Sequence, residues 1–370
     1  MSAAPAGNVD ADTPATRDGA GPDDEIAFAD PQLVVRRPGF SFRLSRRSVV
    51  VIGALAVIAV CLGLLSLATG SYALDLGQVV GALTGRESGI VSTIVVEWRL
   101  PRVLVAALFG LALGVSGAIF QSLTRNPLGS PDIIGFDTGA YTGALVVMLV
   151  VHASGPYAVT IGALLGGLAT AAAVYLFAYR RGVHGFRLII VGIGVTAMLT
   201  SVNTWMLLHA PEQQAVSAAF WGAGSLDSAG YPQLLVAAIA FAVLFPCVAL
   251  LSRGLHLLEL GDDAGRQLGV RAERVRLSAV IVGVALSATV TALAGPIAFV
   301  ALSAPQIARR LTRSPGIALG AAAATGCVLL MASDWIAQHA LPTVEPVGLV
   351  TVVLGGGYFL WLLIVEGRRA

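Results

Sequence analysis

Long apolar runs dominate this chain and constrain its fold more than any other feature. A helix that crosses a bilayer needs about 20 mostly apolar residues. Ten stretches approach or reach that length, near 48–68, 103–121, 133–152, 157–178, 188–209, 232–252, 275–293, 297–311, 316–337 and 346–366. We therefore predict an all-α polytopic membrane protein with about ten transmembrane helices. The eighth stretch is short and contains Pro305, so we expect it to be broken or steeply placed.

The composition excludes a soluble enzyme with a wet surface. Apolar residues make up 56% of the chain and charged residues only 12%, against about 25% charged in average soluble domains. All 23 basic residues are Arg and none is Lys, so the chain cannot supply the lysine of a nucleotide-binding P-loop. If it performs energy-driven work, a partner must supply the energy. The net charge of +2 gives no argument for a nucleic-acid partner.

The first 47 residues differ from the rest and are predicted to form a disordered cytoplasmic tail, acidic and then basic. Residues 1–30 carry seven acids and one Arg, and residues 31–47 carry five Arg and no acid. Ser45-Arg46-Arg47 resembles a twin-arginine export signal, but the downstream chain is also membrane-like. We favour a basic flank of the first helix. A transmembrane domain over 48–366 and a short tail over 367–370 complete the predicted organisation.

The arginines predict the orientation of the helices. With the N-terminal tail inside, the predicted inner segments hold 19 Arg, and the outer ones only Arg86, Arg99 and Arg102. Because cytoplasmic loops carry an excess of Arg, this bias predicts an even number of spans with both termini cytoplasmic.

The predicted spans contain almost no charge. Asp137 and Asp334 lie near helix ends, and Arg309 and Arg310 close a helix. Buried ionisable groups usually mark the relay of an ion-coupled carrier, so their scarcity disfavours that class. Cys and His lack the spacing of a metal site, and none is predicted. A membrane scaffold or sensor without transport is the other rival.

Two arginines flank a rigid turn before the second predicted helix. Arg99-Leu-Pro-Arg102 could present positive charge to the carboxylates of an extracytoplasmic partner. It could equally be an ordinary interfacial anchor. Charge alone does not decide between these interpretations.

The inner segment 257–270 is too short and too polar to span a bilayer. Its apolar residues Leu258, Leu260, Ala264, Leu268 and Val270 give it an amphipathic pattern. It could be a helix that docks in a groove on another protein or one that lies on the membrane. The pattern alone favours the second interpretation.

Proline and glycine interrupt the hydrophobic run over 294–310. Broken helices at membrane depth occur where they face protein or a water-filled cavity. Gly295, Pro296, Pro305 and Gln306 are therefore candidates for a translocation path. A kink buried against neighbouring helices is the alternative.

Together these motifs resemble the permease family of ABC importers for ferric siderophores, haem and vitamin B12, over residues 48–366. The matching stretches are Arg99–Arg102, Ser116-Gly117 with Gln121 and Asn126–Leu128, Leu260–Gly269, Ala294–Phe299, Asp334 and Glu345–Gly348. The coupling stretch is one residue longer than in the family pattern. Gln306 and Gly355–Tyr358 are similar to the ferric-enterobactin permease branch, whose members form half of a heterodimer. Some relatives carry an outer Arg where Gln338 stands, so one docking charge is missing or comes from the paired subunit.

The resemblance implies a type II ABC importer fold and a permease subunit that moves a ferric siderophore across the inner membrane of a bacterium. Haem or vitamin B12 is the alternative cargo. The implied partners are a second permease subunit, two ATPase subunits that bind ATP and Mg²⁺, and a substrate-binding lipoprotein. The permease itself would carry no catalytic residue and no cofactor. Arg99 and Arg102 would dock the lipoprotein, and the ATPase-coupling residues would be Leu260, Gly261, Asp262, Asp263, Ala264, Leu268 and Gly269.

Overall fold

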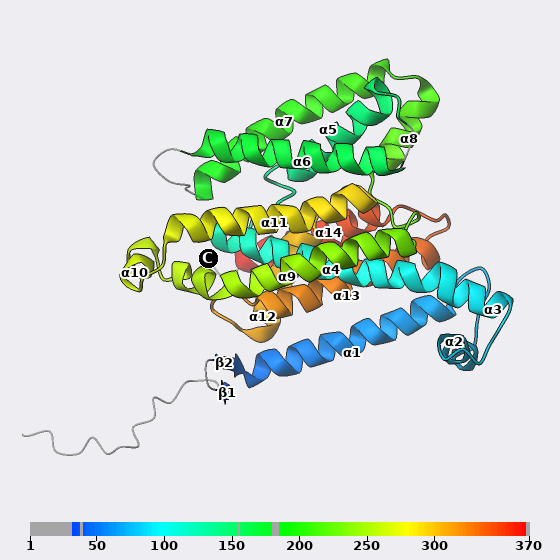
Figure 1. Cartoon of the computed structure of the whole chain (residues 1–370), viewed down its shortest axis with the longest axis horizontal. Coiled ribbons are helices and arrows are strands. Elements are labelled where there is room, and N and C mark those ends of the chain that lie inside the picture. The colour runs from blue at the N-terminus through cyan, green and yellow to red at the C-terminus, as the bar shows by residue number, and fades with distance from the viewer. Residues whose placement is uncertain (1–31, 38–39, 154–155, 180–184, 368–370) are drawn as a thin grey trace, which may run out of the picture. The chain divides into compact units, whose positions relative to one another are not determined.

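The computed structural model describes residues 32–37, 40–153, 156–179 and 185–367 (Figure 1). The chain divides into two compact units, 1–47 and 48–370. In the first, β1 (Gln32–Arg37) pairs antiparallel with β2 (Phe40–Ser45), and Val34 stands opposite Arg43. The composition predicted a disordered tail here. The alternation of Phe40, Phe42 and Leu44 with polar residues is typical of a strand.

The second unit is helical. Its elements are α1 (Arg46–Ala68), α2 (Leu76–Leu83), α3 (Ile90–Ser92), η1 (Thr93–Arg99), α4 (Leu100–Thr124), α5 (Phe136–Leu145), η2 (Val146–Val150), α6 (Pro156–Ala178), α7 (Gly185–His209), α8 (Glu212–Gly222), α9 (Tyr231–Glu259), α10 (Asp262–Gln267), α11 (Ala272–Ala294), α12 (Val300–Thr312), α13 (Leu319–His339) and α14 (Val347–Gly367). The all-α membrane fold is confirmed for this unit. Each predicted span coincides with a helix, and only the end of α9, at Glu259 in place of 252, moves by more than a turn.

Not every predicted span can cross a bilayer alone. Within the described residues, seven helices are long and apolar enough to cross, and the apolar helices over 136–150 and 347–362 are shorter. The eighth predicted span is α12, whose 13 residues extend only about 20 Å at 1.5 Å per residue. Since a hydrocarbon core is about 30 Å thick, α12 begins part-way through the bundle.

Helix α4 lies at the centre of the second unit and packs against α9, α11, α12 and α13 (Figure 1). Of its most apolar stretch, 72% is buried, whereas the figure for α1 is 6%. Gly110 and Gly114 place the α4 backbone directly against Gly326 and Ala322 of α13. This close approach is the one that small residues at four-residue spacing allow between membrane helices.

Candidate functional site

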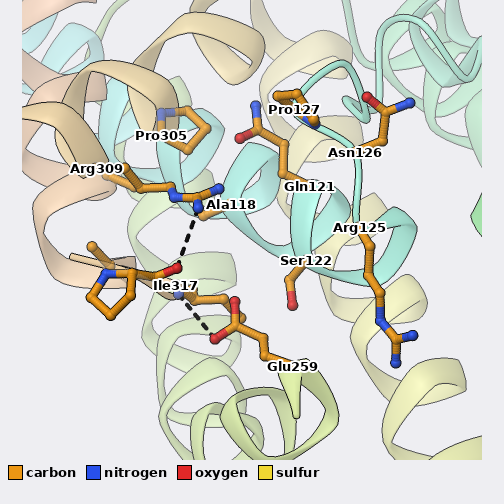
Figure 2. Close-up of a pocket in the computed structure, with 13 residues that line it drawn as sticks. Ala118, Gln121, Ser122, Arg125, Asn126, Pro127, Glu259, Pro305, Arg309 and Ile317 are labelled. Atoms are coloured by element: carbon orange, nitrogen blue, oxygen red, sulfur yellow. Dashed lines mark hydrogen bonds between the residues drawn. The ribbon is translucent and has the colours of Figure 1, made fainter. Parts of the chain in front are cut away.

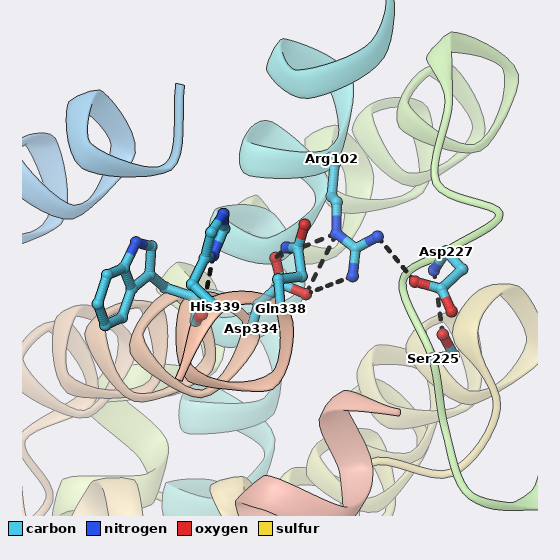
Figure 3. Close-up of polar contacts among 7 residues, drawn as sticks. Arg102, Ser225, Asp227, Asp334, Gln338 and His339 are labelled. Carbon is cyan, nitrogen blue, oxygen red and sulfur yellow. Dashed lines mark hydrogen bonds and ion pairs between the residues drawn. The ribbon is translucent and has the colours of Figure 1, made fainter. Parts of the chain in front are cut away.

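Arg102 is the centre of a polar cluster that joins three segments (Figure 3). Its Nη2 lies 2.8 Å from Asp334 Oδ1 on α13, and its Nη1 lies 2.8 Å from Asp227 Oδ1 in the loop before α9. Gln338 Nε2 donates to Asp334 Oδ2 at 2.7 Å. We call Arg102, Asp227, Asp334 and Gln338 the Arg102 cluster. It is an ion-pair network near the first turn of α4.

The two acids of the cluster differ in exposure. The side chain of Asp334 is 4% exposed and that of Arg102 17%, whereas that of Asp227 is 59% exposed. A buried pair is costly to break because one charge is left without its partner, so Arg102–Asp334 fixes α4 to α13. The contact with Asp227 faces solvent and is the weaker of the two.

Arg99 is also occupied by partners within the chain. Its Nη1 donates to Leu67 O and its Nη2 to Tyr72 O, both at 2.7 Å. These bonds fasten the end of η1 to the end of α1 and the turn that follows it. The two predicted docking arginines therefore have structural partners that the sequence analysis did not predict. A docking carboxylate would have to share a guanidinium with these internal partners or displace Asp227 from Arg102.

The predicted coupling residues lie in one compact turn. Helix α9 ends at Glu259, Gly261 follows with φ +110°, and α10 begins at Asp262. Gly269 closes the turn with φ +83°. These positive φ angles favour glycine, which has no Cβ to clash. Leu260 and Leu268 are more than half exposed, so two large apolar side chains project from a short polar segment.

The chain is broken at Gly295–Phe299, between α11 and α12. Gly295 has φ +73° and Phe299 has φ +68°, and the Gly295 backbone packs against Trp221. The prediction of an interruption at Gly295-Pro296 is thus confirmed, but the one at Pro305 is wrong, because Pro305 lies inside α12. Proline there cannot donate to Ala301 O. The backbone of Gly117 approaches that carbonyl closely instead.

A second helix also begins part-way through the bundle. Between α4 and α5, Thr124 packs beside Gly185, and Gly135 beside Thr196 of the same helix, α7. Gly185 and Thr196 are eleven positions apart on α7, or about 16 Å, so the connecting segment rises by that amount before α5 starts. It carries Asp132, whose Oδ2 accepts from Phe299 N at 3.1 Å.

Asp132 therefore connects the two helix breaks. Its Oδ1 is buried without a hydrogen-bond partner among the described residues. Asp132 was not among the candidate residues predicted from the sequence. An acid between two apolar runs was the available signal, since ionisable groups at membrane depth are rare.

The two acids of the predicted spans are both buried and bonded. Asp137 is 8% exposed and accepts from Thr291 Oγ1 at 2.8 Å. Asp334 is held by Arg102. Asp137 thus fastens α5 to α11, just as Asp334 fastens α13 to α4.

A cavity of about 300 Å³ lies near the other end of α4 (Figure 2). We call it the Gln121 cavity. Its lining includes Gln121, Ser122, Asn126, Glu259, Pro305 and Arg309. Gln306 holds one wall in place, because its Nε2 donates to Gln121 Oε1 at 3.1 Å and to Pro127 O at 3.0 Å. Gln121 Nε2 in turn donates to Leu302 O at 2.9 Å. These bonds fasten α12 to the end of α4.

Comparisons with known proteins agree on one family. The FecCD transport family model matches residues 56–365. The chain is 47% identical over 327 residues to the ferric enterobactin transport system permease protein FepG of Escherichia coli, covering 88% of this chain and 99% of the relative. It is 36% identical over 349 residues to the achromobactin transport system permease protein CbrC of Dickeya dadantii, covering 93% and 99%.

A solved structure has a similar fold. It is a metal-chelate type ABC transporter in an inward-facing conformation, with a TM-score of 0.73 and 25% identity. The match covers 86% of this chain and 99% of that one. Family and fold therefore agree over most of the second unit.

Proposed function

Because this chain belongs to the FecCD transport family, we propose that it is the permease subunit of an ABC importer that moves a ferric siderophore into the cytoplasm. The observation that carries the proposal is the 47% identity to a ferric enterobactin permease over 99% of that relative's length. A multi-pass helical fold without a P-loop lysine suits a transport subunit that relies on a separate ATPase. ATP and Mg²⁺ would bind to that ATPase.

The arginine distribution supports the orientation that we propose. Of the arginines outside the first 30 residues, 19 fall on one predicted side and three on the other, and cytoplasmic loops are the Arg-rich ones. Both termini, the coupling segment and the Gln121 cavity would then face the cytoplasm of a bacterial cell. The Arg102 cluster would lie at the outer face.

The proposed mechanism uses both ends of the subunit. A binding lipoprotein would deliver the chelate to the outer face, where its carboxylates meet Arg102 and Arg99. Leu260 and Leu268 would seat the coupling segment in a groove on an ATPase. Closure of two ATPase subunits would then rock this chain against a second, related permease and alternate access to a path between them.

The helix breaks supply the part of the subunit that can change shape. Gly295, Pro296 and Phe299 form a joint between α11 and α12, and Asp132 holds that joint to the segment before α5. Because a few non-helical residues can absorb the φ and ψ changes of such a motion, we place the moving part of the path here. Pro305 and Gln306 belong to the rigid side of the joint.

Uptake by cells that lack their own permease tests the proposal. Such cells receive this chain with its partner subunits, and accumulation of ⁵⁵Fe-labelled ferric enterobactin is compared with that of haem and vitamin B12. We expect uptake of the ferric siderophore only. Selective uptake of haem or vitamin B12 would assign the other cargo. Uptake that stops on loss of the proton gradient while ATP is maintained would instead identify an ion-coupled carrier.

A further inference from the structure

The end of α9 is held by two loops that come from distant parts of the chain. Arg125 Nη2, after α4, donates to Leu258 O at 3.0 Å. Ile317 N, between α12 and α13, donates to Glu259 Oε2 at 3.2 Å. Leu258 and Glu259 end α9 and directly precede Leu260, the first of the predicted coupling residues. A displacement of those coupling residues at their α9 end therefore acts on these two contacts.

The two contacts lead to elements that are themselves joined. Gln121 bonds α4 to α12 through Leu302 O and Gln306. The Gln121 cavity lies between this joined pair and the end of α9, and both Glu259 and Arg309 line it (Figure 2). The end of α9 therefore has open space beside it.

Gly316 is the feature that lets Glu259 reach the α12–α13 loop. A Cβ built on Gly316 would lie 2.5 Å from Glu259 Oε2, so a side chain there would force the carboxylate to shift from its position beside Ile317 N. The carboxylate forms a charge-assisted bond to a backbone N–H, which is stronger than a bond between neutral groups. The contact between Glu259 and Ile317 N can thus be disrupted by a substitution at Glu259 or, separately, by one at Gly316.

We propose that Glu259 is a positioning residue that transmits movement of the coupling segment to the α12–α13 loop and so to the break before α12. The proposal rests on the function proposed above, since it requires a driving ATPase. Gly261 provides the joint between α9 and α10. Glu259 lies on the bundle side of that joint, where its carboxylate holds the end of α9 to the α12–α13 loop.

The test uses the complete importer in proteoliposomes, with binding protein outside and ATP inside, and measures siderophore uptake and ATP hydrolysis together. Glu259→Ala and Gly316→Ala should each lower uptake per ATP by about fivefold, a size typical of mutations along a coupling network, with hydrolysis retained. Glu259→Gln should restore uptake, because its amide oxygen still accepts. The double variant should be no worse than either single one, since both remove the same contact.

Glu273→Ala is the matched control, because it removes an exposed acid at the start of α11 and should leave uptake per ATP unchanged. The proposal is overturned if both single variants keep the wild-type ratio, if their effects add, or if uptake and hydrolysis fall together. Failure of the proposed function would look different. In that case the wild-type complex itself would show no ATP-dependent uptake.

Discussion

The two ends of α4 are built in different ways. Near its start, Arg102 forms ion pairs with Asp334 and Asp227 and joins three segments. Near its other end, Gln121 makes hydrogen bonds between neutral groups beside a cavity of about 300 Å³. The two residues are 19 positions apart, or about 29 Å along the helix.

The difference indicates which end can move. Breaking a buried ion pair leaves an uncompensated charge, whereas a neutral hydrogen bond can be exchanged at low net cost. The Arg102 end therefore acts as a fixed anchor. The cavity end has weaker contacts and space beside it. The mechanism proposed above would use both kinds of end.

The largest expected effect comes from removing the anchor. Asp334→Ala leaves Arg102 without its buried partner and should lower the free energy of unfolding by about 3–5 kcal/mol. Thermal unfolding in detergent measures this loss. Asp227→Ala is the matched control and should cost about 1 kcal/mol or less, because that pair is exposed. Equal losses for the two variants would mean that the buried and the exposed ion pairs of Arg102 stabilise the protein equally.

The next effect lies between the two ends, where α4 meets α12. In Gly117→Ala the new Cβ would overlap the carbonyl of Ala301, and such overpacking costs about 1–3 kcal/mol. Siderophore uptake should fall as well, since α12 is displaced. Gly194→Ala on α7, where a Cβ meets nothing within 4 Å, controls for the change of residue type. A Gly117→Ala protein as stable as the control would show that α4 and α12 are not in close contact at Gly117.

A smaller effect is expected at the cavity. Gln121→Ala removes the donor to Leu302 O and the acceptor of Gln306, and should cost about 1–3 kcal/mol. The loss should be below that of Asp334→Ala in the same unfolding assay. Ser122→Ala, on the same wall of the cavity, should be close to neutral. A loss for Gln121→Ala equal to that of Asp334→Ala would mean that both ends are anchors.

The smallest effect on stability is expected at the exposed ion pair between Arg102 and Asp227. Asp227→Asn weakens one exposed contact of Arg102, worth about 1 kcal/mol or less, and leaves more of the guanidinium available to a docking carboxylate. Binding of the siderophore-loaded lipoprotein should therefore become tighter, by about threefold, when measured by titration calorimetry. Weaker binding would assign Asp227 a direct part in docking.

The helices could be predicted well because a membrane helix is identified by a continuous run of apolar residues. All ten predicted spans coincide with helices in the described residues. The broken run at Gly295-Pro296 was also visible, since glycine and proline act locally. The break expected at Pro305 does not occur. Pro305 leaves the carbonyl of Ala301 without its helical donor, and the backbone of Gly117 on α4 packs closely against that carbonyl. The proline is therefore accommodated inside α12.

The partners of the predicted site residues could not be read from one sequence. Arg102 and Asp334 are 232 positions apart, and Asp132 and Phe299 are 167 apart. No local pattern pairs such residues, so Arg102 was interpreted as an outward charge and Asp132 was not singled out. Whether the arginines dock a partner stays a prediction. The structure adds that docking would act on a guanidinium already bound to Asp334.

Transport by the purified permease pair tests the central claim most directly. The pair is reconstituted in vesicles with the binding protein and ⁵⁵Fe-siderophore, with and without the ATPase subunits and ATP. The account predicts accumulation only when ATPase and ATP are both present, and none when a proton gradient replaces them. Accumulation by the permeases alone would contradict it.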